Sequence, residues 1–156
     1  MPAEFFTFRE YMKKDEDLLT ASMEDYLEMI YRLSKNTGFT RINDLAAALN
    51  VQPPSATKMV QKLAEAGYVN YERYGIILLS KNGEKRGRTL LERHRVVEDF
   101  LNLLGISEEI LEETEKIEHT IGARTLNCLA DFVNFFKDRP DLVRQFEAYR
   151  KRKREA

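Results

Sequence analysis

The chain has few side chains that could form covalent links or bind soft metal ions. Among its 156 residues there is one cysteine and there are two histidines. A single cysteine cannot form an internal disulfide bond, so a disulfide-stabilised scaffold is excluded. Cys128 lies within an apolar helical pattern, and we predict that it is a core residue rather than a ligand or a nucleophile.

Long hydrophobic runs are also missing from the sequence. No apolar stretch approaches the length of about 20 residues that a membrane-spanning helix needs, and the N-terminus has no hydrophobic signal region. We therefore expect a cytoplasmic protein without a membrane partner. Internal repeats are absent as well.

The chain has almost no net charge. Its 25 basic and 26 acidic residues give a formal net charge of −1, so bulk charge does not predict a nucleic-acid partner. The two signs are nevertheless segregated, because basic residues are dense between Lys58 and Arg88 while acidic residues dominate from Ser107 to Glu118. This pattern is expected when one part of a protein faces phosphates and another part holds cations.

The first half of the chain has the element order of a winged helix-turn-helix. Residues 1–21 form an N-terminal extension, either a short helix packed on the body or a partly ordered arm. The following elements are a helix from Met23 with Ser22 as its N-cap, a helix over Arg41–Asn50, a helix over Ser55–Ala66, and a β-hairpin over Tyr68–Ser80 with its turn at Tyr74-Gly75. A short helix, a turn, a second helix and a hairpin follow one another in this order in a winged helix-turn-helix domain. We assign this domain to residues 22–80.

The second half, residues 81–156, is predicted to be all helical. Its elements are a helix over Lys81–Leu104, an acidic helix that Ser107 caps and that runs to about Ile121, a helix over Leu126–Phe136, and a helix from Asp141 to about Arg150 followed by a basic tail. The apolar stripe of Leu126–Phe136 fits either a core or a subunit interface.

Both histidines lie beside carboxylates on predicted helices. The set is spread over three helices: Asp25 and Glu28 on the first, His94 and Glu98 on the long helix, and Glu115, Glu118 and His119 on the acidic helix. Oxygen and imidazole ligands suit a divalent first-row metal such as manganese.

Each of these residues also has an ordinary structural interpretation. The acidic helix could be a solvated face with a surface histidine, and His94 could be a core histidine. Asp25 could belong to a capping box with Ser22, and Glu28 could pair with Arg32. Only their joint occurrence favours a metal site.

The predicted helix after the two prolines carries short polar and basic side chains at its N-terminal end. Recognition helices present that end to base edges, whereas an ordinary amphipathic helix or a protein-binding winged helix would not need this composition. The candidate DNA contacts are Ser55, Thr57, Lys58, Gln61 and Lys62 on this helix and Arg73 at the hairpin tip, the last of these for phosphate.

Four motifs in order resemble a known family. They are Ser22–Tyr31 (SMEDYLEMIY), Pro54–Leu63 (PSATKMVQKL), Glu92-Arg-His94 and Ile117-Glu-His119. They resemble the diphtheria toxin repressor family, and within it the manganese transport regulator branch, over roughly residues 20 to 140.

The resemblance implies a homodimeric, metal-activated transcriptional repressor. Its fold would be mainly α, with an N-terminal winged helix-turn-helix, a small β-hairpin wing, and an all-helical metal-binding and dimerisation domain. The implied metal ligands, for two Mn²⁺ ions per subunit, are Asp25, Glu28, His94, Glu115, Glu118 and His119. Iron-type relatives carry Met at the Asp25 position and Cys at the Glu115 position, so the carboxylates here favour manganese.

The iron-type relatives also have a second site that uses a further histidine. This chain has no third histidine, although Glu98 matches one carboxylate of that site. The implied partner is a palindromic double-stranded DNA operator, and the implied role is control of metal-ion uptake.

Other functions stay open at this point. One is an iron-responsive or metal-independent winged-helix regulator. Another is a di-metal carboxylate enzyme, which is disfavoured because Glu-x-x-His, the motif of ferritin-like sites, occurs nowhere in the sequence. We therefore expect a regulator and not an enzyme.

Overall fold

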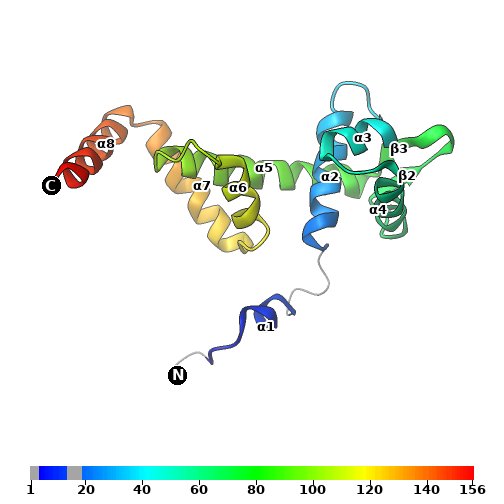
Figure 1. The fold of residues 1–156 in the computed structure, drawn as a ribbon, viewed down its shortest axis with the longest axis horizontal. Coiled ribbons are helices and arrows are strands. Elements are labelled where there is room, and N and C mark those ends of the chain that lie inside the picture. Colours follow the sequence, from blue (N-terminus) through cyan, green and yellow to red (C-terminus); the bar gives the residue numbers. More distant parts are fainter. Residues whose placement is uncertain (1–3, 14–18) are drawn as a thin grey trace. The chain divides into compact units, whose positions relative to one another are not determined.

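The computed structural model describes residues 4–13 and 19–156. The elements are α1 (Phe8–Lys13), α2 (Ala21–Ser34), β1 (Thr40–Arg41), α3 (Ile42–Leu49), α4 (Pro53–Glu65), β2 (Val69–Tyr71), the 3₁₀ turn η1 (Arg73–Gly75), β3 (Ile76–Leu79), α5 (Lys81–Leu103), α6 (Ile110–Glu118), α7 (Ala123–Lys137) and α8 (Pro140–Glu155) (Figure 1). The chain divides into two compact units, residues 1–87 and 88–156. The predicted fold class, mainly helical with a small sheet in the first half, is confirmed.

The first unit is built around α2, α3 and α4. Their apolar faces form the core, which contains the fully buried side chains Leu27, Ile30, Leu45, Val60, Leu63 and Ile77. The predicted hairpin is present as β2 and β3, and its turn contains two positive φ angles, 63° at Tyr74 and 72° at Gly75. The sequence did not predict β1, a strand of two residues that pairs antiparallel with β3 and gives the sheet order β1-β3-β2.

Ser80 connects the wing to the first turn of α5. Its Oγ donates to the carbonyl oxygens of Gly67 at 2.7 Å and Tyr68 at 3.0 Å, and it accepts a hydrogen bond from Gly83 N at 3.0 Å. Arg86 on α5 also pairs with Glu24 on α2, with 3.1 Å between Nη2 and Oε2. The first turns of α5 are therefore fixed to the first unit.

Two predicted caps are wrong. Thr20 rather than Ser22 is the N-cap of α2, since its Oγ1 accepts from Met23 N at 3.2 Å. Ser107 does not cap the acidic helix, because α6 begins only at Ile110, after Glu109 has adopted a left-handed conformation with φ 56°. Serine residues near a helix start are thus ambiguous, and backbone geometry decides which residue caps.

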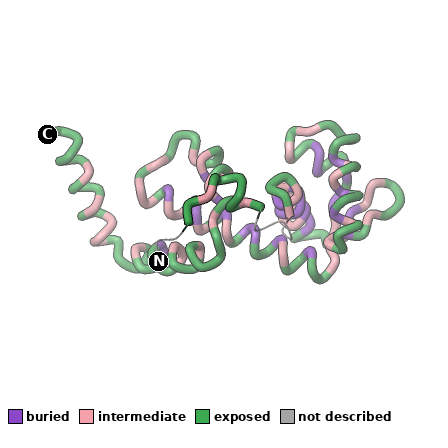
Figure 2. The backbone as a smooth tube through the Cα atoms, turned by 90° about the horizontal axis from the view of Figure 1, so that it is seen from below, coloured by how far each residue is buried: buried purple, intermediate pink, exposed green. Residues whose placement is uncertain are grey.

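Helix α7 in the second unit is mostly exposed. Only Val133 on this helix is buried, and Cys128 is exposed, so the prediction that Cys128 is a core residue is wrong for the single chain. The residues predicted as a basic tail are helical, because α8 continues to Glu155. Figure 2 shows that α8 has no buried residue, in contrast to the densely buried helices of the first unit.

The N-terminal extension contains the short helix α1, as one of its two interpretations expected. None of the residues of α1 is buried, so packing of this helix on the body is not observed in the described part of the chain. Its aromatic side chains Phe5 and Phe8 are exposed.

Candidate metal centre and DNA-binding surface

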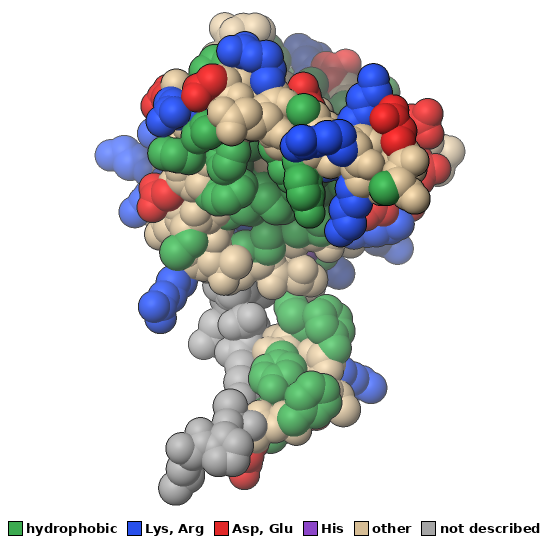
Figure 3. Space-filling view, turned by 90° about the vertical axis from the view of Figure 1, so that its left-hand side faces the viewer, with side chains coloured by type: hydrophobic (Ala, Val, Ile, Leu, Met, Phe, Trp, Pro, Cys, Tyr) green, Lys and Arg blue, Asp and Glu red, His purple; other side chains and the backbone are tan. Residues whose placement is uncertain are grey.

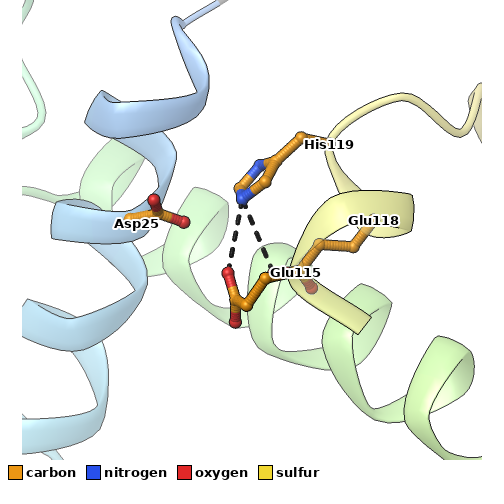
Figure 4. A group of neighbouring side chains, drawn as sticks. All are labelled: Asp25, Glu115, Glu118 and His119. Atoms are coloured by element: carbon orange, nitrogen blue, oxygen red, sulfur yellow. Dashed lines mark ion pairs between the residues drawn. The ribbon is translucent and has the colours of Figure 1, made fainter. Parts of the chain in front are cut away.

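Helix α6 ends in three of the predicted ligands. Glu115 and Glu118 are three residues apart and share a face of the helix, while His119 is the C-cap residue that follows. Figure 4 shows the three side chains gathered at this end of α6, with the ion pairs from His119 to both carboxylates drawn as dashed lines. His119 Nε2 lies 3.5 Å from Glu115 Oε2 and 3.7 Å from Glu118 Oε1.

His94 on α5 faces the same carboxylates. Its Nδ1 lies 3.3 Å from Glu115 Oε1 and 3.2 Å from Glu118 Oε2. Its Nε2 lies 3.1 Å from Glu98 Oε2. The structure therefore brings four of the six predicted ligands together within the second unit, with Glu98 as an additional neighbour.

Glu118 is the deepest group of this cluster. Its side chain is 1% exposed, and neither carboxylate oxygen makes a hydrogen bond of good geometry with any residue that the structure describes. Burial raises the pKa of Glu118 above its usual value, because desolvation disfavours the charged form. A buried carboxylate without donors is costly, and such a group is usually paired or bound to a metal ion.

Glu115 has the opposite shift. Hydrogen bonding to His119, and then to His94, lowers the pKa of Glu115. The two carboxylates thus differ in environment. Glu115 lies between two imidazoles and is half-exposed, whereas Glu118 is buried and has imidazole nitrogens nearby, His94 Nδ1 at 3.2 Å and His119 Nε2 at 3.7 Å, without a hydrogen bond of good geometry to a described residue.

Two further residues contact the cluster and were not among the predicted ligands. Glu98 Oε2 is 3.1 Å from His94 Nε2. The sequence indicated Glu98 by its spacing of four residues from His94 and by its match to a carboxylate of the second site in iron-type relatives. Arg93 Nη2 lies 3.0 Å from His119 Nδ1. Because a guanidinium only donates, Nδ1 of His119 is the acceptor in this contact.

The remaining two predicted ligands lie on α2, in the first unit. Glu28 is buried and Asp25 is half-buried; the Asp25 side chain projects from α2 in Figure 4. Arg32 Nη2 lies 2.6 Å from Glu28 Oε2, so the predicted pairing of Glu28 with Arg32 is present. Since Ser22 is not the N-cap, the alternative in which Asp25 serves a capping box is excluded.

Helix α4 presents the predicted DNA-contact residues on its solvent face. Its first two positions are Pro53 and Pro54, which suit the first helical turn, and Ala56, Val60 and Leu63 are buried on its other face. Ser55, Lys58, Gln61 and Lys62 are exposed, and Thr57 is half-buried with its hydroxyl donating to the Pro53 carbonyl at 3.1 Å.

The wing tip is equally accessible. Arg73 is exposed in η1, and the neighbouring Tyr74 is 89% exposed. The sequence pattern predicts only a turn at Tyr74, although an exposed aromatic side chain at a wing tip is a candidate contact to the DNA backbone. No helix among the described residues is long and apolar enough to cross a membrane.

Both halves of the chain match a known family. Residues 18–77 match the iron dependent repressor N-terminal DNA binding domain, and residues 80–145 match the iron dependent repressor metal binding and dimerisation domain. The chain is 45% identical over 130 residues to the HTH-type transcriptional regulator MntR of Lysinibacillus sphaericus (strain C3-41), covering 83% of this chain and 94% of the relative. It is 40% identical over 136 residues to the regulator of the same name from Bacillus pumilus (strain SAFR-032), covering 86% of this chain and 94% of the relative.

Solved structures of metal-dependent regulators are also similar to this chain. The structure of the manganese regulator SloR aligns with a TM-score of 0.66 and 34% identity, covering 75% of this chain and 55% of that one. A manganese-dependent transcriptional repressor in complex with manganese aligns with a TM-score of 0.62 and 28% identity, covering 72% of this chain and 53% of that one. The chain thus spans about half the length of these solved structures.

These findings confirm the resemblance that the four sequence motifs indicated. The two matched domains imply DNA and a second copy of the chain as partners, and they identify a transcriptional regulator rather than an enzyme, as predicted. The chain belongs to the iron dependent repressor family of metal-dependent transcriptional regulators.

Proposed function

We propose that this protein is a manganese-activated, sequence-specific repressor of metal-ion uptake genes. The observation that carries the proposal is the Glu118 carboxylate, which is buried among His94, Glu115 and His119 without a hydrogen-bond donor of its own. A divalent cation would compensate the negative charge of this buried carboxylate.

The donor types support manganese over softer metals. The cluster offers carboxylate oxygens and imidazole nitrogens, and the single Cys128 is exposed on α7 rather than part of it. Carboxylates suit Mn²⁺, whereas thiolates would favour zinc, copper or iron–sulfur centres. The relatives named as manganese regulators agree with this choice.

We further propose that the ligand set is completed by α2 and holds two ions per subunit. The full set is Asp25, Glu28, His94, Glu115, Glu118 and His119. The family resemblance supports this set, and so does the burial of Glu28, a carboxylate that would otherwise be costly to bury. Glu28 would exchange its pairing with Arg32 for a metal ligand role.

The resulting mechanism couples two sites. His94, Glu115, Glu118 and His119 from the second unit and Asp25 and Glu28 from α2 would hold the cations, whose positive charge would offset that of the clustered carboxylates. Without bound cations Glu115 and Glu118 would repel each other, while the ion pair of Glu24 with Arg86 lies within the first unit and does not depend on metal. The ligand residues would thus restrict the positions of the two α4 helices in a dimer to a spacing of about one helical turn of DNA.

Ser55, Thr57, Lys58, Gln61 and Lys62 would then face base edges and adjacent phosphates, and Arg73 would contact a phosphate from the wing. Two-fold symmetry of the dimer implies a palindromic operator. A repressor that acts on chromosomal DNA would work in the cytoplasm.

The test uses a duplex selected from a randomised DNA pool in the presence of Mn²⁺. We expect the selected sequence to be palindromic and the affinity for it to rise at least tenfold when Mn²⁺ is added to chelator-treated protein. Fe²⁺ under anaerobic conditions should activate less. Equal affinity with and without metal would leave a metal-independent regulator, and stronger activation by Fe²⁺ would replace manganese by iron.

A further inference from the structure

The last two turns of α8 concentrate positive charge. Five consecutive cations occupy Arg150–Arg154, and every residue from 151 to 156 is exposed. The family's domain model ends at residue 145, so these residues lie outside the matched metal-binding and dimerisation domain. Their role is therefore not covered by the family's domains.

One of the five cations is used inside the second unit. Arg150 donates a hydrogen bond from Nη1 to the carbonyl oxygen of Leu104 and lies over the ring of Phe146, with 5.6 Å from Cζ to the ring centroid. Gly105, with φ +79°, leaves the space that the guanidinium occupies, because a Cβ there would lie 2.4 Å from Nη1. Arg150 thus fixes α8 to the end of α5.

The other four cations are not neutralised. Lys151, Arg152, Lys153 and Arg154 make no ion pair with any described residue, and Glu147 and Glu155 are the only acidic residues near them on α8. The segment Lys151–Arg154 is therefore an exposed, helical cationic segment.

The apolar side chains of α8 lie in its first half and face the other helices of the second unit. Val143 and Phe146 line an apolar cavity of about 210 Å³ together with Phe100, Leu103, Leu104, Phe132 and Phe136. Figure 3 views the end of the molecule that carries α8, where hydrophobic side chains gather and Lys and Arg side chains lie around them. The last turns offer only Ala148, Tyr149 and Ala156 as apolar residues, too few for the apolar face with which membrane-surface helices insert.

We propose that Lys151–Arg154 bind the phosphate backbone of duplex DNA without reading its sequence. The proposal rests on the function proposed above only in that the chain binds DNA through its first unit. Once that unit is bound, the cationic end of α8 is held at high local concentration near the same duplex, which favours a second, weak contact. Cationic side chains that neutralise phosphates release counterions, so the contact must be salt-dependent.

The salt dependence gives a quantitative expectation. Each neutralised phosphate changes the slope of log K against log salt by about −0.9, so four cations per subunit contribute up to about 4 to the magnitude of the slope. Loss of the contact would reduce non-specific affinity most at low salt and leave the preference for the operator nearly unchanged, because phosphate contacts carry no sequence information.

The experiment compares three full-length proteins with Mn²⁺ present. They are the wild type, the variant K151Q/R152Q/K153Q/R154Q, and the control variant R9Q/K13Q/R124Q/R139Q. The control also removes four positive charges from exposed positions, but none of them belongs to the candidate DNA-contact residues or to Lys151–Arg154. Glutamine preserves helix propensity. Binding to a fluorescent duplex of unselected sequence is measured between about 50 and about 200 mM salt, the range over which phosphate contacts change affinity strongly.

We expect the slope to fall in magnitude by at least about 2 in the α8 variant and by less than about 1 in the control. Equal slopes in the two variants would overturn the proposal. Vesicles containing phosphatidylserine provide a second probe, and binding to them that the α8 variant alone loses, with an unchanged DNA slope, would assign the segment to lipid instead. The effect of Mn²⁺ on operator affinity is measured in parallel, so a failure of the metal switch is seen separately from a failure of this contact.

Discussion

At the scale of single residues, the burial of the Glu118 carboxylate is energetically unfavourable for the folded protein. The chain places a carboxylate where its side chain is 1% exposed and provides no well-oriented donor among the described residues. Burying such a group without compensation costs several kcal/mol, on the order of the net stability of a small domain. A site with this property is unfavourable for folding and favourable for a cation, which is the arrangement that a metal-responsive protein requires.

Replacement of Glu118 by glutamine should therefore separate metal binding from folding. We expect E118Q to bind Mn²⁺ at least tenfold more weakly, a loss of about 1.4 kcal/mol or more. The free energy of unfolding of the metal-free protein should stay the same or rise by up to about 2 kcal/mol, because an amide is less costly to bury than a carboxylate. Isothermal titration calorimetry and urea denaturation with a chelator present measure the two quantities.

A suitable control is E112Q on the same helix. Glu112 is exposed and pairs with Lys116, with 2.6 Å between Oε1 and Nζ. A fully exposed ion pair contributes little to stability, so both metal affinity and stability should remain close to those of the wild type. A loss of metal-free stability in E118Q of more than about 1 kcal/mol would show that Glu118 has a structural role instead.

The choice of metal is also argued at this scale. Glu115 lies between His94 and His119, at 3.3 Å and 3.5 Å, so a substitution there changes the donor set directly. Cysteine in this position would supply a soft thiolate, and we expect E115C to lower the preference for Mn²⁺ over Zn²⁺ or Fe²⁺ by at least tenfold. Competition titrations measure the ratio, and an unchanged ratio would remove Glu115 from the ligand set.

At the scale of elements, the connection between the wing and α5 depends on a close backbone approach. A Cβ on Gly83 would lie 1.8 Å from the carbonyl oxygen of Tyr68, and that oxygen also accepts from Ser80 N at 3.0 Å. The backbone cannot move away without losing these hydrogen bonds. Only glycine therefore fits here, although it is a poor helix former.

We accordingly expect G83A to destabilise the protein by about 2 to 3 kcal/mol, even though alanine has the higher helix propensity. The neighbouring substitution N82A, at an exposed position in the same turn, should change stability by less than about 0.5 kcal/mol. Denaturant unfolding followed by circular dichroism measures both. A neutral or stabilising G83A would mean that the wing separates from α5 without cost.

The elements also show what the sequence could predict and what it could not. Helical periodicity and the glycines at positions 67 and 105 were sufficient to locate α4 and α5, because both glycines adopt the positive φ that ends a helix. Strand β1 was missed since two residues carry no periodicity, and its pairing with β3 depends on tertiary structure. Among the site residues, the contact of Arg93 with His119 could not be predicted, because it arises only once α5 and α6 are packed. The contact of Glu98 with His94 follows from their spacing of four residues on α5.

At the scale of the whole molecule, the second unit exposes several large apolar side chains. Three large apolar side chains on α6 and α7 are about half exposed: Leu111 at 60%, Phe132 at 47% and Phe135 at 53%. Contiguous exposed apolar side chains mark interaction sites, and Phe132 and Phe135 both contact the Phe136 ring. The stripe on α7 that fitted either a core or an interface is thus covered only in part by its own chain, as a dimerisation domain requires.

A substitution of Phe135 tests that surface most directly, because exposed aromatic side chains are often hot spots of an interface. We expect F135D to weaken dimerisation by about 2 kcal/mol or more, roughly 30-fold, while N134D, at the exposed neighbouring position, leaves it unchanged. Sedimentation equilibrium gives both dissociation constants.

If F135D dimerises as tightly as the wild type, the interface lies elsewhere on the second unit. If it dissociates, its operator affinity should fall as well, since one subunit contacts only one half-site of a palindrome and the two weak contacts no longer reinforce each other.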